Sequence, residues 1–154
     1  MKTVWHLGAA AISLAFGISP VVAASVPNDR HWSTNHLAQL PAELQSRVLL
    51  LQRACGSEIS AQHYFSTSIE IGGESFRALH FQNLSCQNRQ LICHASGCLH
   101  EIYRRGNATF GKIFGLFAED VRMENDSGIL LIRATLGGET QTFRWTGSTF
   151  VRAR

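Results

Sequence analysis

The spacing of hydrophobic positions changes once along this chain, near residue 60. Before that point, apolar residues fall at i, i+4, i+7 and i+11, which places them on one face of a helix. These residues are Leu44, Val48, Leu51 and Cys55. Pro41 suits a first helical turn, and Gly56 suits the left-handed position that ends a helix. The pattern predicts one amphipathic helix from Pro41 to Cys55, whose buried face ends in a cysteine.

From Tyr64 onward, apolar and polar residues alternate with a period of two, as in half-buried strands. Short glycine-containing turns separate these segments, at Gly72, Gly106, Gly128, Gly137 and Gly147. Strands joined by short turns usually pair with each other. The expected fold class is therefore mainly β, an antiparallel meander or curled sheet of about seven short strands with one N-terminal helix. We expect a single domain over residues 41–154, preceded by an irregular arm over residues 25–40.

The first 24 residues have the pattern of an export signal. Lys2 precedes an apolar run from Leu7 to Ala24, and small residues at its end suit a signal peptidase. The run is short for a bilayer core of about 30 Å, and Pro20 interrupts it. Cleavage after Ala24 is favoured over a retained anchor. We expect a periplasmic or secreted protein with no membrane span after cleavage.

Loss of the leader leaves about 130 residues, enough for one domain with its own core. Because Lys2 is removed, the formal net charge falls from +3 to +2. A charge this small argues against a nucleic-acid partner. Another envelope or extracellular protein is the partner class that the expected compartment favours.

The four cysteines are expected to form two disulfides, because exported proteins escape the reducing thiols of the cytoplasm. Four cysteines allow three pairings. We favour Cys93–Cys98, which closes a short loop, together with Cys55–Cys86, which ties the helix end to the sheet. The pairing of Cys86 with Cys93 and of Cys55 with Cys98 stays open.

A metal site is the alternative interpretation of the same cluster. Cys93, His94, Cys98 and His100 lie within eight residues, and zinc accepts such ligands. The spacing lacks a second cysteine pair, and oxidation would remove the thiolates. We therefore expect no metal and no cofactor, with His94 and His100 pointing outward from their strands.

Sequence motifs of hydrolases and nucleotide-binding proteins are missing, including G-x-S-x-G, H-E-x-x-H and the phosphate loop. Glu70, His80 and Glu101 could be assembled into an acid–base group on a sheet face, but such strand residues are usually solvated. We therefore expect a protein that acts by binding. An enzyme with a site in the Cys86–His100 loop is the alternative.

Three arginines lie on predicted strands whose apolar neighbours point the other way. On adjacent strands, Arg77, Arg133 and Arg144 would form a basic stripe for an anionic polysaccharide, phosphate or acidic protein. A solvated outer sheet face explains the same pattern. A polyanion-binding module is therefore a further alternative.

The cysteine and aromatic pattern resembles that of a loose group of small exported bacterial proteins, mostly uncharacterised. The matching residues are Cys55-Gly56, Cys86, Gly97-Cys98, Ile102-Tyr103, Trp145, Gly147 and Phe150. Some members carry an acidic segment like a calcium repeat before the central cysteine, whereas residues 69–75 here have too few carboxylates for one. The resemblance implies an exported, disulfide-stabilised fold and no particular activity.

Overall fold

The computed structural model describes residues 31–56 and 58–153. The expected leader over residues 1–24 and the first part of the expected arm lie outside the described residues. The helices are α1 (Asn35–Ala38) and α2 (Ala42–Cys55), and the 3-10 turns are η1 (His63–Phe65), η2 (Phe81–Asn83) and η3 (Arg89–Leu91). The strands are β1 (Ser66–Ile71), β2 (Glu74–His80), β3 (Cys93–His94), β4 (Gly97–Arg105), β5 (Phe110–Ala118), β6 (Asp120–Asp126), β7 (Ile129–Leu136), β8 (Glu139–Trp145) and β9 (Phe150–Arg152).

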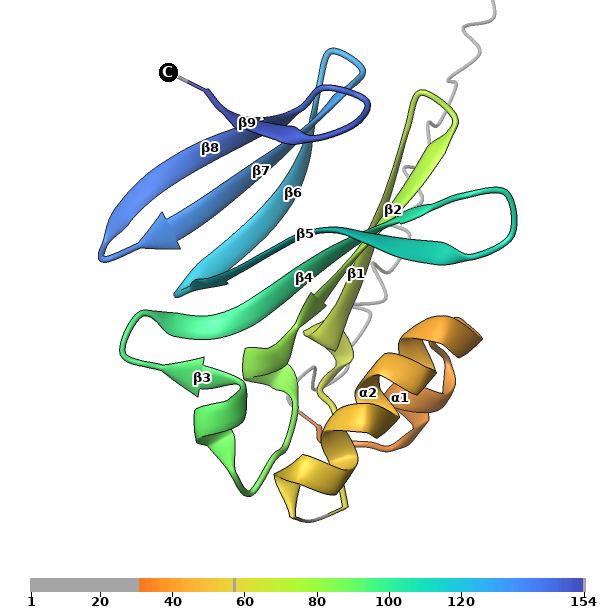
Figure 1. Ribbon diagram of the computed structural model, residues 1–154, viewed down its shortest axis with the longest axis vertical. Helices are drawn as coiled ribbons and strands as arrows, with labels where there is room; N and C mark the ends of the chain where they lie inside the picture. The colour runs from red at the N-terminus through yellow and green to blue at the C-terminus, as the bar shows by residue number, and fades with distance from the viewer. Residues whose placement is uncertain (1–30, 57, 154) are drawn as a thin grey trace, which may run out of the picture.

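The strands form two antiparallel sheets (Figure 1). In the first sheet, β1 pairs with β2, and both β2 and β3 pair with one edge of β4. β5 pairs with the opposite edge of β4. The second sheet is the meander β6-β7-β8-β9. The mainly β, antiparallel, disulfide-stabilised fold with one principal N-terminal helix is therefore confirmed. The described part of the chain has nine strands instead of about seven, and the two-residue strand β3 is one that was not expected. The last four strands form a sheet of their own.

A single residue, Glu119, separates β5 from β6. Ala118 still pairs with Cys98 in the first sheet, whereas Asp120 pairs with Thr135 in the second. The backbone N–H of Glu119 donates to the carbonyl of Thr135. The chain thus passes from one sheet to the other without a turn.

The helix α2 forms as its sequence pattern predicts. Pro41 is its N-cap, and Gly56 ends it with a φ of +75°, a left-handed conformation that glycine adopts at little cost. Leu44, Val48 and Cys55 are buried along one face. The arm before it is more ordered than expected, since α1 spans Asn35–Ala38 and Ser33 forms a β-bridge with Ala61.

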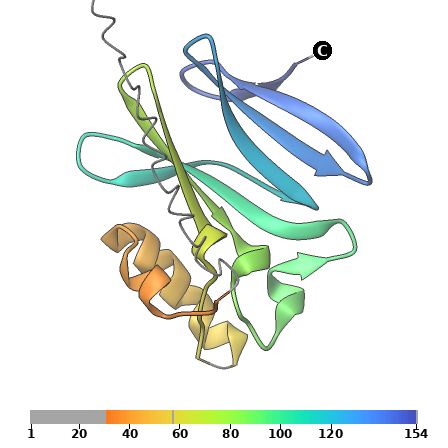
Figure 2. The same ribbon diagram turned by 180° about the vertical axis from the view of Figure 1, so that it is seen from behind.

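The first sheet lies between two layers. The face that carries Leu79 and Tyr103 packs against α2, and the face that carries Ala78 and Ile102 packs against the second sheet. Figure 2 shows α1 and α2 on the side of the first sheet away from β6–β9. Both faces of β4 are therefore covered. Within residues 31–56 and 58–153, no helix has the length and apolar character needed to cross a bilayer.

Candidate functional site

The structure contains two disulfides, Cys55–Cys86 and Cys93–Cys98, which is the favoured pairing. Cys55 and Cys86 are 0 % and 6 % exposed, and they join the end of α2 to the segment after η2. Cys93 and Cys98 are directly paired residues of β3 and β4, and both are half-buried. One bridge lies in the core and the other near the surface.

The residues of the alternative metal site are not brought together. The sulfurs of Cys93 and Cys98 are bonded to each other. His94 is exposed and its ring lies 3.8 Å from that of Phe117, centroid to centroid. The expectation that His100 points outward is wrong, because its ring is 0 % exposed. The physical reason is that the central residues of β4, residues 100–103, are covered on both faces of the sheet.

The predicted arginine stripe is divided between the two sheets. Arg77 lies on β2, where its Nη1 donates to Ser66 Oγ, whereas Arg133 and Arg144 lie on β7 and β8. Arg133 Nε lies 2.6 Å from Glu124 Oε2, so a carboxylate already neutralises it. A continuous basic stripe across adjacent strands is not formed by these three residues.

The helix-facing side of β4 buries one carboxylate, Glu101, which is 1 % exposed. Arg47 of α2 donates from Nε and Nη2 to its two oxygens, each at 3.0 Å. The hydroxyl of Tyr103 donates at 2.6 Å, and Lys112 Nζ lies at 3.3 Å. Burial raises the pKa of Glu101, but the hydrogen bonds from Arg47 and Tyr103 outweigh it and hold this pKa below its usual value. Glu101 is therefore an ionised anchor that fixes α2 on the sheet.

The opposite side of β4 buries a histidine pair. His80 Nδ1 and His100 Nδ1 lie 2.9 Å apart, His80 Nε2 lies 2.9 Å from Thr67 Oγ1, and His100 Nε2 lies 3.3 Å from the carbonyl oxygen of Ala118. A carbonyl only accepts, so His100 carries its proton on Nε2 and accepts at Nδ1. His80 then donates from Nδ1 and accepts from the Thr67 hydroxyl. Every polar atom of the two neutral rings is satisfied by this single arrangement.

Burial, together with a positive charge on His100, lowers the pKa of His80 to about 4, against the opposing effect of the Asp120 carboxylate. Burial also lowers the pKa of His100, against the opposing effect of its hydrogen bond to Ala118. Thr67, His80 and His100 are connected in the same order as the nucleophile, the base and the orienting residue of a catalytic triad. However, His80 is 6 % exposed and is a poor proton acceptor near pH 7, so the arrangement suits a structural role.

The expected face shared by Glu70, His80 and Glu101 is likewise not formed. His80 and Glu101 are buried on opposite faces of the sheet, since His80 is paired with His100 and Leu79 with Glu101. The expectation of solvated side chains is wrong for these two residues.

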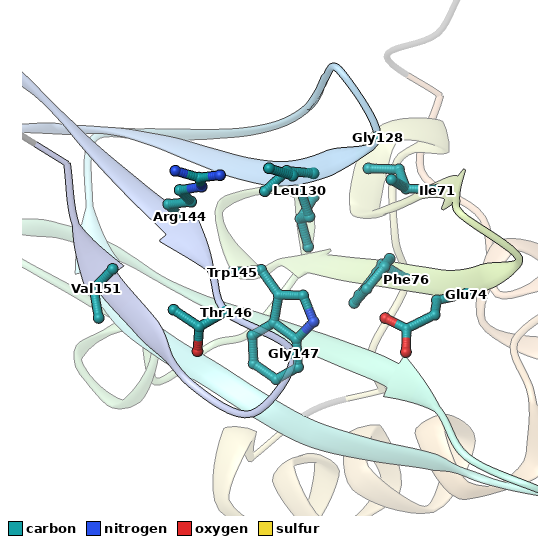
Figure 3. Close-up of a pocket in the computed structure, with 11 residues that line it drawn as sticks. Ile71, Glu74, Phe76, Gly128, Leu130, Arg144, Trp145, Thr146, Gly147 and Val151 are labelled. Carbon is teal, nitrogen blue, oxygen red and sulfur yellow. The ribbon is translucent and has the colours of Figure 1, made fainter.

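A cleft of about 520 Å³ opens between the β1–β2 hairpin and the ends of β7, β8 and β9 (Figure 3). Its lining residues are Ile71, Glu74, Phe76, Gly128, Ile129, Leu130, Arg144, Trp145, Thr146, Gly147 and Val151. Four of them are buried apolar residues in mutual contact: Ile71, Phe76, Leu130 and Trp145. The volume falls within the range of about 300–1,000 Å³ that small-molecule sites occupy.

Two charged side chains line this cleft. Glu74 is paired with Arg104 at 2.6 Å, and the Arg104 guanidinium lies 5.9 Å from the centre of the Trp145 ring. Arg144 is exposed, and among the described residues no carboxylate lies within ion-pair distance of it. The indole N–H of Trp145 is buried without a hydrogen-bond partner in the described part of the chain. The cleft therefore combines an apolar floor with one available cation.

The sequence singles out Arg144 as a possible anion ligand, but no feature of it places Arg144 in one cleft with Phe76 and Trp145. They come from two sheets, and no local pattern links them. No family model, curated protein or solved structure matches this chain.

Proposed function

We propose that this protein is a binding protein of the periplasm or cell exterior whose cleft takes a small amphiphilic anion, an apolar body that carries a carboxylate or phosphate. The observation that carries the proposal is the cleft itself, where Phe76, Leu130 and Trp145 form an apolar floor. Arg144 supplies a positive charge that no carboxylate in the described part of the chain neutralises. Burial of an apolar group there would contribute about 25 cal/mol per Å².

Export is supported by the two disulfides and by the leader pattern of residues 1–24. Expression of the full chain in an exporting bacterium, followed by intact mass measurement without reductant, tests this part. A mass that begins near Ser25 and lacks the four hydrogens of two disulfides is expected. Retention of the leader would contradict export with cleavage.

Titration with 1-anilinonaphthalene-8-sulfonate, an aromatic anion, tests the ligand class. Arg144→Gln is expected to weaken binding about tenfold, the loss that removal of one charge-assisted contact produces. Val151→Glu adds a negative charge to the lining of the cleft and is expected to weaken binding further. Arg133→Gln is the matched control, since Arg133 is exposed on the neighbouring strand and lies outside the cleft lining.

Competition separates the anionic group from the apolar body. Decanoate is expected to displace the probe at lower concentration than decanol, because only decanoate can pair with Arg144. Equal displacement by both, together with unchanged binding in Arg144→Gln, would leave a purely apolar site and would contradict the proposal. Circular dichroism of each variant verifies that the fold is retained.

A further inference from the structure

The surface-proximal disulfide, Cys93–Cys98, has a cation beside it. The Arg89 guanidinium donates from Nη2 to Cys93 Sγ at 3.1 Å, and the same nitrogen lies 3.8 Å from Cys98 Sγ. Nη1 of Arg89 lies 3.4 Å from the carbonyl oxygen of Leu84, which holds the side chain over the sulfurs. None of the ion pairs in the described part of the chain involves Arg89. Its charge is therefore available to the disulfide.

The local backbone also allows this disulfide to be opened while the rest of the fold is retained. Cys93 belongs to a two-residue strand, and the closed loop has a sequence separation of only 5. Gly97 shapes the turn, because its φ is +108° and a Cβ there would lie 2.1 Å from the carbonyl oxygen of Ala118. Opening the bridge would leave the long pairing of β4 with β5 in place.

We propose that Cys93–Cys98 is a thiol–disulfide exchange site for an external dithiol, such as a reducing protein with two vicinal cysteines. The site is independent of the cleft proposed above. A thiolate of the dithiol attacks Cys98 Sγ, the Cys93–Cys98 bond breaks, and Cys93 leaves as a thiolate. The second thiol of the reductant, after losing its proton, attacks the mixed disulfide, so that Cys98 is released and the dithiol is oxidised to its own disulfide.

Arg89 determines which sulfur leaves. A thiolate beside a guanidinium is stabilised, and a more stable thiolate is a better leaving group. Cys93 Sγ is the closer sulfur to Arg89, so attack on Cys98 is favoured. The Cys55–Cys86 bridge resists the same reagent, because its sulfurs are buried and an attacking thiolate must reach them.

Stepwise reduction of the folded protein by dithiothreitol, with iodoacetamide trapping and peptide mass mapping, tests the site. Cys93 and Cys98 are expected to be alkylated well before Cys55 and Cys86, while far-UV circular dichroism is unchanged. Reaction with glutathione, which supplies one thiol, is expected to leave the adduct on Cys98. Simultaneous reduction of both bridges, or an adduct on Cys93, would overturn the proposal.

Variants of Arg89 test the role of its charge. Arg89→Gln is expected to slow reduction of Cys93–Cys98 about threefold to tenfold, and to slow alkylation of reduced Cys93 at pH 7. Arg89→Lys should restore most of both rates. Arg105→Gln removes an exposed arginine elsewhere on the first sheet and serves as the control. Unchanged rates in Arg89→Gln would show that the cation has no part in the exchange.

Discussion

One face of β4 buries a charged side chain, and the other face buries neutral polar side chains. On the helix side, Glu101 is charged and is held by donors from Arg47, Tyr103 and Lys112. On the side of the second sheet, His100 and His80 are neutral and satisfy one another. The depth of burial is nearly equal, at 1 % exposure for Glu101 and 0 % for His100.

The difference in ionic state depends on which hydrogen-bonding and charged groups lie near each face of β4. Arg47 and Lys112 are partly exposed, so their charged ends bring a solvated positive charge to Glu101 from the rim of the layer. Between the two sheets, the histidines contact a hydroxyl and a carbonyl, which satisfy a neutral ring and add no charge. Burial lowers the pKa of both histidines by more than the charge of Asp120 raises it. Burial alone therefore does not fix an ionic state; the donors within hydrogen-bond distance decide it.

Arg47→Met should have the largest effect on stability. The substitution keeps apolar contact with the sheet but leaves Glu101 without its two-point partner, and breaking a buried ion pair costs about 3–5 kcal/mol. Urea denaturation at pH 7 measures the free energy of unfolding. Arg53→Met, at an exposed position in the last turn of the same helix, should change it by less than about 0.5 kcal/mol. A similarly small loss of stability for Arg47→Met would show that Lys112 and Tyr103 are sufficient to stabilise the buried Glu101 carboxylate.

As the pH falls, the protein should lose stability first through protonation of His80 and only at lower pH through protonation of Glu101. The unfolded chain binds a proton at His80 near pH 6.5, whereas the folded protein does so only near pH 4. Stability from His80 is therefore lost as the pH falls through this window, by about 3 kcal/mol in total. Glu101 has a lowered pKa, so its contribution is lost only below its unfolded value of about 4.5.

Urea denaturation at a series of pH values tests this order. His80→Gln should reduce the slope of stability between pH 6.5 and 4, although its stability at neutral pH is lower. Part of the slope should remain, because the pKa of His100 is also lowered by burial. His94→Gln replaces an exposed histidine outside the pair and serves as the control. An unreduced slope in His80→Gln would assign the acid sensitivity to other groups.

Thr67→Val should have an intermediate effect. Valine matches the shape of threonine but removes the hydroxyl that donates to His80 Nε2, and an unsatisfied buried acceptor costs about 1–3 kcal/mol. Thr140→Val, at an exposed position of β8, is the control and should be nearly neutral. Equal thermal midpoints for the two variants would show that His80 finds another donor.

Lys112→Ala should have the smallest effect. Its side chain is 55 % exposed and its contact with Glu101 is the longest of the set, so solvent screens the interaction. We expect a loss below about 1 kcal/mol, which should shrink further in high salt. A loss of stability as large as that of Arg47→Met would mean that Lys112 is as important as Arg47 for neutralising Glu101.

Local signals were sufficient for the fold class and for the helix. The apolar stripe of α2, its glycine cap and the glycine turns depend on residues close in sequence, and each is found where predicted. The separation into two sheets was not predictable in the same way. Ala118, Glu119 and Asp120 carry no turn signal, so the pattern gave no reason to divide the strands there.

The buried polar groups and Arg89 were harder to predict for a different reason. Alternation along a strand indicates which residues share a face, but β4 is covered on both faces, so neither His100 nor Glu101 could be recognised as buried. The strand β3 has only two residues, too few to show an alternation of apolar and polar positions. Arg89 and Cys93 are four residues apart, and without a helical pattern around them the sequence did not indicate that their side chains are in contact.

The crossing at Glu119 also has a consequence for the order in which the protein is built. The helix, both disulfides and all strands of the first sheet precede it, while the second sheet is formed by residues 120–152 alone. A chain that leaves a ribosome or a translocation channel N-terminus first can complete and cross-link its first sheet before residues 120–152 emerge. We expect the apolar face at Ala78 and Ile102 to be the surface on which the remaining hairpins then assemble.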